Sequence, residues 1–254
     1  MNVLELNGLT KKFGGITAVN DVTFHVEEKQ IFALIGPNGA GKTTAFNLIS
    51  GVYVPTSGTV SFCGKTLNKM KPNRIVKEGI ARTFQNIRLF GKMTALENVM
   101  TGFSCRTEAD VFSIILQPGK CRKEHEETEK KALEILDYIG LADIKNELAG
   151  SLPYGHQRLL EIARALACQP RLLMLDEPAA GMNKAEKQDL VKLITKIRDE
   201  LGITVMLVEH DMDVIMTIAD MIAVLNYGSL LAFGTKEEIQ NDTAVIEAYL
   251  GNGD

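Results

Sequence analysis

The hydrophobic positions of this chain fall into short apolar runs separated by longer amphipathic stretches. Val22, Phe24 and Val26 alternate with polar residues, which is the pattern of a half-buried strand. Residues 31–35 are apolar throughout, as in a buried strand, and residues 44–49 carry apolar side chains at helical spacing. The first part of the chain therefore predicts strands, followed by a strand, a loop and a helix in succession.

The middle of the chain has a helical pattern, from about Leu96 to Glu161. An apolar stripe on a charged helix is formed by Ala132, Leu133, Ile135, Leu136 and Ile139. Gly140 is predicted to end that helix. The segment Arg106–Glu127 is harder to interpret, because its apolar run 111–116 fits both an amphipathic helix that packs on a partner and a local cluster of core residues.

Strand-like runs return in the last third of the chain, at residues 172–175 and 203–208. The amphipathic stretch between them predicts a helix that begins after Asn183 as N-cap, because Glu186 stands three residues further on, as in a capping box. Gly202 is placed to end this helix. Strands that alternate with helices indicate a parallel α/β core.

Turn residues divide the remaining apolar runs. Gly14-Gly15 separates two strand-like runs near the N-terminus, and residues 55–58 predict a turn into another. Residues 226–228, Asn-Tyr-Gly, lie between two apolar runs and predict a β-hairpin. We interpret residues 96–161 as a helical insertion into the α/β core.

Composition narrows the class of protein without identifying it. The 254 residues are 45% hydrophobic and 24% charged, which is ordinary for one large globular domain or two small ones. The net charge of −4 disfavours a broad nucleic-acid interface, which needs a basic domain. The four cysteines are scattered without a C-x-x-C pair, so we predict a reducing compartment and neither a disulfide framework nor a zinc site. Because no secretory signal and no bilayer-length apolar run is visible, we expect a cytosolic chain that reaches a membrane only through a partner.

Residues 36–43, Gly-Pro-Asn-Gly-Ala-Gly-Lys-Thr, fit the phosphate-loop pattern G-x-x-x-x-G-K-[ST]. The glycines let backbone N–H groups point at a polyphosphate, and the N-terminus of the following helix adds its positive dipole end. In this chemistry Lys42 reaches the β- and γ-phosphates, and the Thr43 hydroxyl holds Mg²⁺. A plain glycine turn with a surface lysine would not need the flanking strand and helix, so we predict that the chain binds a nucleoside triphosphate.

Two carboxylates, Asp176 and Glu177, follow the apolar run 172–175, and Pro178 comes next. Neighbouring side chains on a strand point to opposite faces, so the two acids are predicted to have different tasks. In a phosphate-loop ATPase the first holds Mg²⁺ through water, and the second activates the attacking water as a general base. A solvated strand end is the alternative.

Two further polar residues are candidates for the same site. His210 stands at the end of the next predicted strand, at the edge of an α/β sheet where ligands bind, and is predicted to contact the γ-phosphate. Gln85, within residues 82–86, is placed to reach Mg²⁺ or the attacking water. A glutamine by itself is weak evidence for such a role.

In order and spacing these motifs resemble the ATP-binding subunits of ABC transporters, from about Leu4 to Leu250. The matching motifs are the Walker A loop at 36–43, the Q-loop at Gln85, the signature at Leu152–Gln157, the Walker B pair at Asp176-Glu177 and the switch histidine at His210. The resemblance implies an α/β fold, a P-loop NTPase core with a parallel sheet and an N-terminal antiparallel β subdomain. It also implies a single domain, 1–254, with a helical subdomain inserted at about 88–162.

The resemblance implies a role for each matching residue. The catalytic residues would be Lys42, Gln85, Glu177 and His210. The Mg²⁺ ligands would be Thr43, Gln85 and Asp176. The nucleotide would contact Phe13, which matches the family's adenine-stacking aromatic residue, and Gly36, Pro37, Asn38, Gly39, Ala40, Gly41, Lys42, Thr43, Thr44, Tyr154, Gly155 and His156.

A narrower resemblance is to the ATPase subunits of branched-chain amino acid importers. It is carried by residues 82–90, 93–99, 152–158, 178–183 and 249–251. It implies ATP and Mg²⁺ as cofactors, a second ATPase subunit in a heterodimer or homodimer, membrane permease subunits and, indirectly, a solute-binding protein. It places the chain on the cytoplasmic side of the cell membrane and implies no nucleic acid.

Other functions fit the same motifs. Importers of urea or of other amino acids use similar ATPase subunits, and a soluble ABC ATPase, such as an iron–sulfur assembly factor, is a further alternative. A regulatory module that binds nucleotide without hydrolysing it is disfavoured by Glu177, the residue placed to activate water.

The signature motif departs from the family's L-S-G-G-Q. Pro153 stands at the serine position, Tyr154 at the first glycine position and His156 at the glutamine position. Proline has neither a hydroxyl nor a backbone N–H, and one lost hydrogen bond to a charged phosphate costs roughly 1.5–3 kcal/mol. Asn183 likewise replaces the family's D-loop aspartate. We therefore expect a weak ATP site where this signature contributes, and an active one where this chain's Walker motifs meet a partner's standard signature.

Overall fold

The computed structural model describes residues 1–105 and 118–250. The chain divides into two compact units, one formed by Met1–Arg82 with Arg171–Asp254 and the other by Thr83–Pro170. The apolar run 111–116 lies outside the described residues, so neither of the two interpretations given for it is tested.

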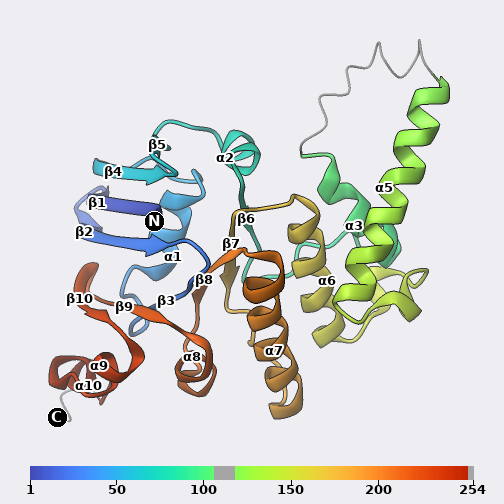
Figure 1. Cartoon of the computed structure of the whole chain (residues 1–254). Helices are drawn as coiled ribbons and strands as arrows, with labels where there is room; N and C mark the ends of the chain where they lie inside the picture. The colour runs from blue at the N-terminus through green and yellow to red at the C-terminus, as the bar shows by residue number, and fades with distance from the viewer. Residues whose placement is uncertain (106–117, 251–254) are drawn as a thin grey trace. The chain divides into compact units, whose positions relative to one another are not determined.

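In the described part of the first unit, the strands form two sheets (Figure 1). The antiparallel sheet has the order β2 (Ile16–Glu27), β1 (Asn2–Phe13), β4 (Ser57–Phe62) and β5 (Lys65–Thr66). The larger sheet has the order β10 (Ser229–Gly234), β9 (Met221–Asn226), β3 (Ile31–Ile35), β8 (Thr204–Val208), β7 (Leu172–Asp176) and β6 (Ile80–Arg82). Its neighbouring strands are parallel except for the antiparallel pair β9 and β10. The predicted parallel core with an N-terminal antiparallel sheet is confirmed.

The helices of the first unit are α1 (Lys42–Ile49), α2 (Pro72–Glu78), α7 (Lys184–Leu201), α8 (Met212–Ile218), α9 (Lys236–Gln240) and α10 (Thr243–Leu250). The described residues of the second unit form α3 (Ala95–Phe103), α5 (Pro118–Tyr138), η1 (Ala142–Ile144), η2 (Ala149–Ser151) and α6 (Tyr154–Ala167). On α5 the predicted stripe is confirmed, because Ala132 and Leu136 are fully buried and Gly140 follows with a φ of 78°. Among the described residues, no helix is both long and apolar enough to span a bilayer.

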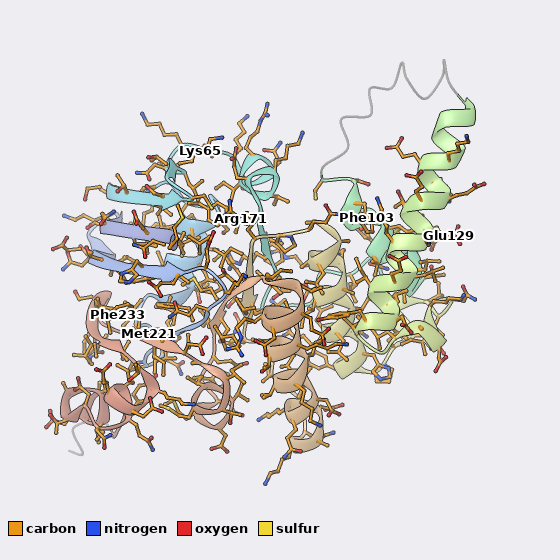
Figure 2. All side chains as sticks on the ribbon, viewed as in Figure 1. Lys65, Phe103, Glu129, Arg171, Met221 and Phe233 are labelled. Atoms are coloured by element: carbon orange, nitrogen blue, oxygen red, sulfur yellow. The ribbon has the colours of Figure 1, made fainter. Side chains whose placement is uncertain are left out.

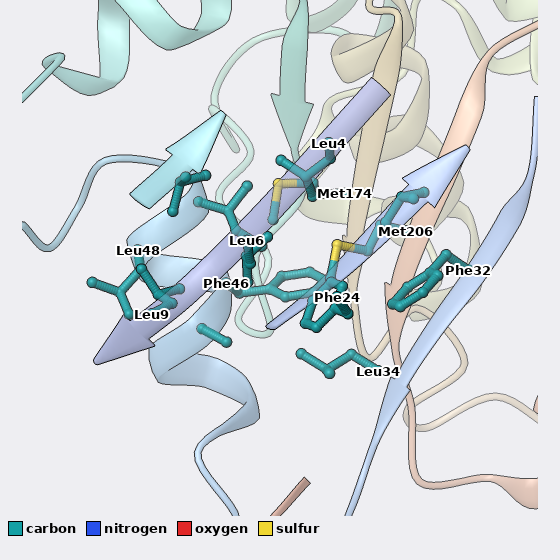
Figure 3. Packing of buried hydrophobic residues seen from close by; sticks show 14 of the residues in the cluster. Leu4, Leu6, Leu9, Phe24, Phe32, Leu34, Phe46, Leu48, Met174 and Met206 are labelled. Atoms are coloured by element: carbon teal, nitrogen blue, oxygen red, sulfur yellow. The ribbon is translucent and has the colours of Figure 1, made fainter. Parts of the chain in front are cut away.

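A single hydrophobic cluster joins both sheets of the first unit to α1 (Figure 3). It contains Leu4, Leu6, Leu9, Phe24, Phe32, Leu34, Phe46, Leu48, Met174 and Met206. Met221 and Phe233, on neighbouring strands of the larger sheet, pack against it as partly buried side chains (Figure 2). The cluster therefore fixes α1, and the loop before it, against the ends of β3, β7 and β8.

Two local predictions are confirmed at atomic detail. The Asn183 side chain caps α7 by accepting hydrogen bonds from Ala185 N and Glu186 N, and the Glu186 carboxylate accepts one from Asn183 N. The hairpin between β9 and β10 turns at Tyr227 and Gly228, whose φ angles are 45° and 82°. Two successive positive φ angles are the signature of a type I′ turn, which matches the twist of the flanking strands.

Candidate functional site

The predicted phosphate loop connects the end of β3 to the start of α1. A Cβ at Gly36 would lie 2.1 Å from Leu225 O, and one at Gly41 would lie 2.5 Å from Ala18 O. Both positions therefore require glycine. Gly41 is the N-cap of α1, has a φ of 99° and has no side chain that could cap the first N–H groups of that helix. These N–H groups and the helix dipole suit an anion such as a phosphate, so the residues present fit the predicted ligand.

Lys42 lies over the beginning of the same loop. Its Nζ donates hydrogen bonds to Gly36 O at 2.5 Å and to Pro37 O at 2.9 Å. Burial lowers the pKa of Lys42, and the charge of Glu177 opposes that shift. The ammonium is thus held by the loop in which the sequence pattern places it, near the carboxylate proposed as general base.

Asp176 ends strand β7 and is 3% exposed. Arg82 Nη2 lies 2.7 Å from Asp176 Oδ2. Arg82 Nη1 also donates to Asn47 Oδ1 at 2.7 Å and Ser50 Oγ at 2.8 Å, so one guanidinium joins β6 and β7 to α1. Motif reasoning did not single out Arg82 for this role. The only signal in the sequence was a cation three residues before Gln85, which does not indicate its partner.

Glu177 lies just beyond the strand in which the sequence analysis placed it. Strand β7 ends at Asp176, and Glu177 has a φ of 48°, in the left-handed region that is uncommon for a residue with a side chain. Its N–H donates to Val208 O at 2.9 Å, which anchors this conformation to β8. The direction of its side chain is therefore set by a strained residue and not by strand alternation, which corrects the reason given for its separate role.

His210 and Glu177 are brought close together. Glu177 Oε1 lies 3.9 Å from His210 Nδ1, and the side chain of His210 is 63% exposed. Between them in the sequence, Glu209 is 1% exposed and accepts hydrogen bonds from Ala179 N at 2.7 Å, His210 N at 3.1 Å and Asp211 N at 3.4 Å. Glu209 thus joins the loop after Glu177 to the loop that carries His210, a role that sequence reasoning missed.

The predicted adenine-stacking residue has an aromatic neighbour. Phe13 is 42% exposed, and its ring lies edge-on to Tyr53 at 5.2 Å between centroids. Lys11 Nζ lies 5.0 Å from the Phe13 ring centroid and donates to Val54 O at 2.8 Å. Tyr53 is forty residues away in the chain, so no local pattern could have paired it with Phe13.

The C-terminal helix also reaches the phosphate loop. A cavity of about 490 Å³ is lined by Pro37–Ala40, by the β9–β10 hairpin and by Ala244, Glu247 and Ala248 of α10. Burial raises the pKa of Tyr249 to about 12, although a hydrogen bond from the Gly36 backbone opposes the shift. The first residue of the phosphate loop is therefore in contact with α10.

The remaining predicted residues lie in the second unit. Gln85 is exposed in the segment before α3. Pro153 is the N-cap of α6, Tyr154 is its first residue, Gly155 is buried and His156 is exposed. The structure thus brings Lys42, Asp176, Glu177 and His210 into the first unit, and places Gln85 and the signature residues in the second.

Comparison with known proteins gives a consistent picture. The family model described as ABC transporter matches residues 19–180, and the one described as branched-chain amino acid ATP-binding cassette transporter matches residues 229–254. The chain is 46% identical to the high-affinity branched-chain amino acid transport ATP-binding protein BraF of Pseudomonas aeruginosa, over 98% of both chains. It is 44% identical to the protein LivG of Escherichia coli K12, which has the same description, again over 98% of both chains.

Solved structures that are similar to this chain are also ATP-binding cassettes. A nucleotide-free ATP-binding cassette from an ABC transporter matches with a TM-score of 0.87 at 32% identity, over 99% of this chain and 100% of that one. A dimeric ATP-binding cassette in a post-hydrolysis state, bound to ADP and phosphate, matches with a TM-score of 0.77 at 28% identity, over 91% and 98% of the two chains.

Proposed function

This chain belongs to the ABC transporter family of ATP-binding proteins, and we propose that it is the ATPase subunit of an importer for branched-chain amino acids. As a member of this family it binds nucleotide and hydrolyses ATP in support of transport. The observation that carries the solute class is the 46% identity, over 98% of the chain, to a protein named for branched-chain amino acid transport. The match of residues 229–254 to a model with the same description supports it.

Each group of the first unit has a defined task in this proposal. The loop N–H groups and Lys42 bind the β- and γ-phosphates, and the Phe13 ring stacks on the adenine. Glu177 takes a proton from the attacking water, and His210 contacts the γ-phosphate. Thr43 and Asp176 are the oxygen ligands of this unit that would hold Mg²⁺, which neutralises phosphate charge when bound. Arg82 holds Asp176, and Glu209 holds the loops that carry Glu177 and His210.

We place the partners by the same reasoning. The chain forms a single ABC domain, with a helical subdomain at about 88–162, and pairs with a second ATPase subunit on the cytoplasmic side of the membrane. Permease subunits carry the solute, which a solute-binding protein delivers. A dimeric cassette among the similar structures supports the pairing. The second ATPase would have a standard signature, because Pro153 removes one donor from this chain's own.

Uptake measurements in cells test the proposal. Lys42→Ala replaces the wild-type chain, and uptake of labelled leucine, isoleucine, valine and urea is followed. Lys192→Ala is the matched control, because the Lys192 side chain is 76% exposed and its ion pair within the described residues is with Asp189, which is 73% exposed. Loss of uptake of the three amino acids alone is the expected result. Loss of urea uptake alone would change the solute, and unchanged uptake of all four would favour a soluble ABC ATPase instead.

A further inference from the structure

One buried arginine bonds the helix that carries the altered signature to the segment that carries Gln85. Arg158 lies on α6 and is 3% exposed. Its Nη1 donates to Phe84 O at 2.8 Å, and its Nη2 donates to Gln85 O. The guanidinium is rigid and planar, so two bonds to successive carbonyls fix both the position and the orientation of that backbone.

Tyr154 supplies a third attachment for the same guanidinium. Its hydroxyl oxygen accepts hydrogen bonds from Arg158 Nη2 at 2.8 Å and from Arg158 Nε at 3.1 Å. Tyr154 is itself 45% exposed, and its hydroxyl meets the side chain of Arg158, which lies one turn further along α6. A glycine at this position, as in the family's usual signature, has no group that could do this. The altered signature therefore loses a donor at Pro153 and gains an acceptor at Tyr154.

The same face of α6 holds the segment again one and two turns further on. Glu161 is 1% exposed, accepts a hydrogen bond from Arg88 N at 3.1 Å, and lies 3.6 Å from Arg158. Arg164 Nη1 donates to Arg88 O at 2.6 Å. Tyr154, Arg158, Glu161 and Arg164 are spaced by three or four residues, so they form one stripe of the helix. The segment from Phe84 to Arg88 is thus tied to α6 by backbone atoms at both ends.

We propose that Tyr154 is a positioning residue that connects the signature to the Gln85 segment through Arg158. A nucleotide that presses on the signature end of α6 would shift Tyr154 and Arg158, and with them the carbonyls of Phe84 and Gln85. This rests on the proposed function and adds to it that the Gln85 segment transmits nucleotide closure to the permease subunits. Tyr154 then strengthens the connection between the signature and the Gln85 segment, whereas Pro153 weakens the contact of the signature with phosphate.

Hydrogen exchange of the full-length chain tests the connection without reference to transport. The variants are Tyr154→Phe, which keeps the ring and loses the hydroxyl, Arg158→Lys, which keeps the charge and loses the fork, and the double variant. We expect amides 84–90 to exchange about three- to tenfold faster in each, with no further increase in the double variant. Tyr227→Phe, which removes an 89% exposed tyrosine hydroxyl in the first unit, is the control. Exchange at the wild-type rate in Tyr154→Phe would overturn the connection.

The consequence for transport is tested with the reconstituted transporter. Solute moved per ATP hydrolysed is measured with the same variants in the assembled complex, and we expect that ratio to fall about three- to tenfold in Tyr154→Phe. The double variant should fall no further than the single variants, because both act through one contact. An unchanged ratio beside faster exchange would mean that Tyr154 only orders the backbone, and would overturn the proposal. If the wild-type complex moves none of the tested solutes, the proposed function fails, while exchange still decides the connection.

Discussion

Charged residues have different structural roles in the two units. In the first unit the groups proposed to face the nucleotide lie at strand ends and in loops, while Arg82 bonds to Asp176 and the buried Glu209 bonds to the loop after Glu177. In the second unit a stripe on α6 holds an adjoining segment, and the residue that opens the stripe, Tyr154, is itself part of the signature. In the first unit, the residues proposed to contact the nucleotide differ from those that hold them in place. In the second unit, Tyr154 is proposed to do both. A substitution in the signature therefore changes two properties together, whereas the first unit permits them to be changed one at a time.

The largest expected effect follows from changing Glu177, the residue of the first unit that is proposed to activate the attacking water. Glu177→Gln keeps the shape of the side chain and removes the proposed general base, so we expect phosphate release to fall about a hundredfold or more with ATP binding retained. Glu200→Gln, on the exposed end of α7, is the control, because its side chain is 56% exposed. A variant that still turned over at a tenth of the wild-type rate would remove Glu177 from the catalytic role.

Next in size is the loss of a supporting residue in the first unit. Arg82→Met removes the partner of Asp176 from a pair whose side chains are 8% and 4% exposed, so we expect the free energy of unfolding to fall by about 3–5 kcal/mol. Arg171→Met breaks an exposed pair with Glu28 at the same 2.7 Å and should cost less than about 1 kcal/mol. Urea denaturation of the two variants measures both. Equal losses would mean that burial does not distinguish these ion pairs.

Glu177 and Arg82, the residues changed in these two predictions, also differ in whether the sequence could predict their roles. Lys42, Asp176, Glu177 and His210 were predicted, because each stands in a local pattern at the end of an apolar run. The α/β core followed from the same runs. Arg82, Glu209 and Tyr53 were not predicted, since each acts on a residue brought near only by the fold, and an isolated charge or ring does not name its partner. Strand β6 was missed because three residues carry too little periodicity to be recognised.

A smaller effect separates the two properties that Tyr154 combines. Pro153→Ser restores a hydroxyl at the signature and leaves the tyrosine in place, so ATP turnover of the assembled complex should rise about tenfold if the weak site limits it. Adding Tyr154→Gly should keep the higher turnover but lower the solute moved per ATP. Because Ser is also a better N-cap than Pro for α6, the unfolding midpoint of each variant is measured as well. Turnover equal to wild type in both variants would show that Pro153 does not limit the complex.

The smallest effect compares two buried glutamates, one in each unit. Burial raises the pKa of Glu209 and of Glu161 above the ordinary value of 4.5. A carboxyl whose pKa is higher in the folded state contributes stability that is complete below the unfolded pKa and is lost as the pH rises through the folded pKa. The wild type should therefore lose stability relative to Glu209→Gln as the pH rises from about 4 to 7, by about 1.4 kcal/mol for each pKa unit by which folding raises the carboxyl.

Wild type should also lose stability relative to Glu161→Gln as the pH rises. The difference in unfolding free energy between these two proteins at pH 7 should, however, differ from that for Glu209→Gln. Arg158 lies 3.6 Å from Glu161 and Arg164 lies 3.9 Å from it, so the neutral variant leaves one buried and one partly buried guanidinium group without this carboxylate. At pH 7 we therefore expect Glu161→Gln to be less stable than wild type. Glu209→Gln should stay closer to wild type, because within the described residues the Glu209 carboxylate accepts hydrogen bonds from backbone N–H groups. Urea unfolding of the three proteins across this pH range measures both quantities. A difference from wild type that is independent of pH would exclude titration of these carboxyls on folding.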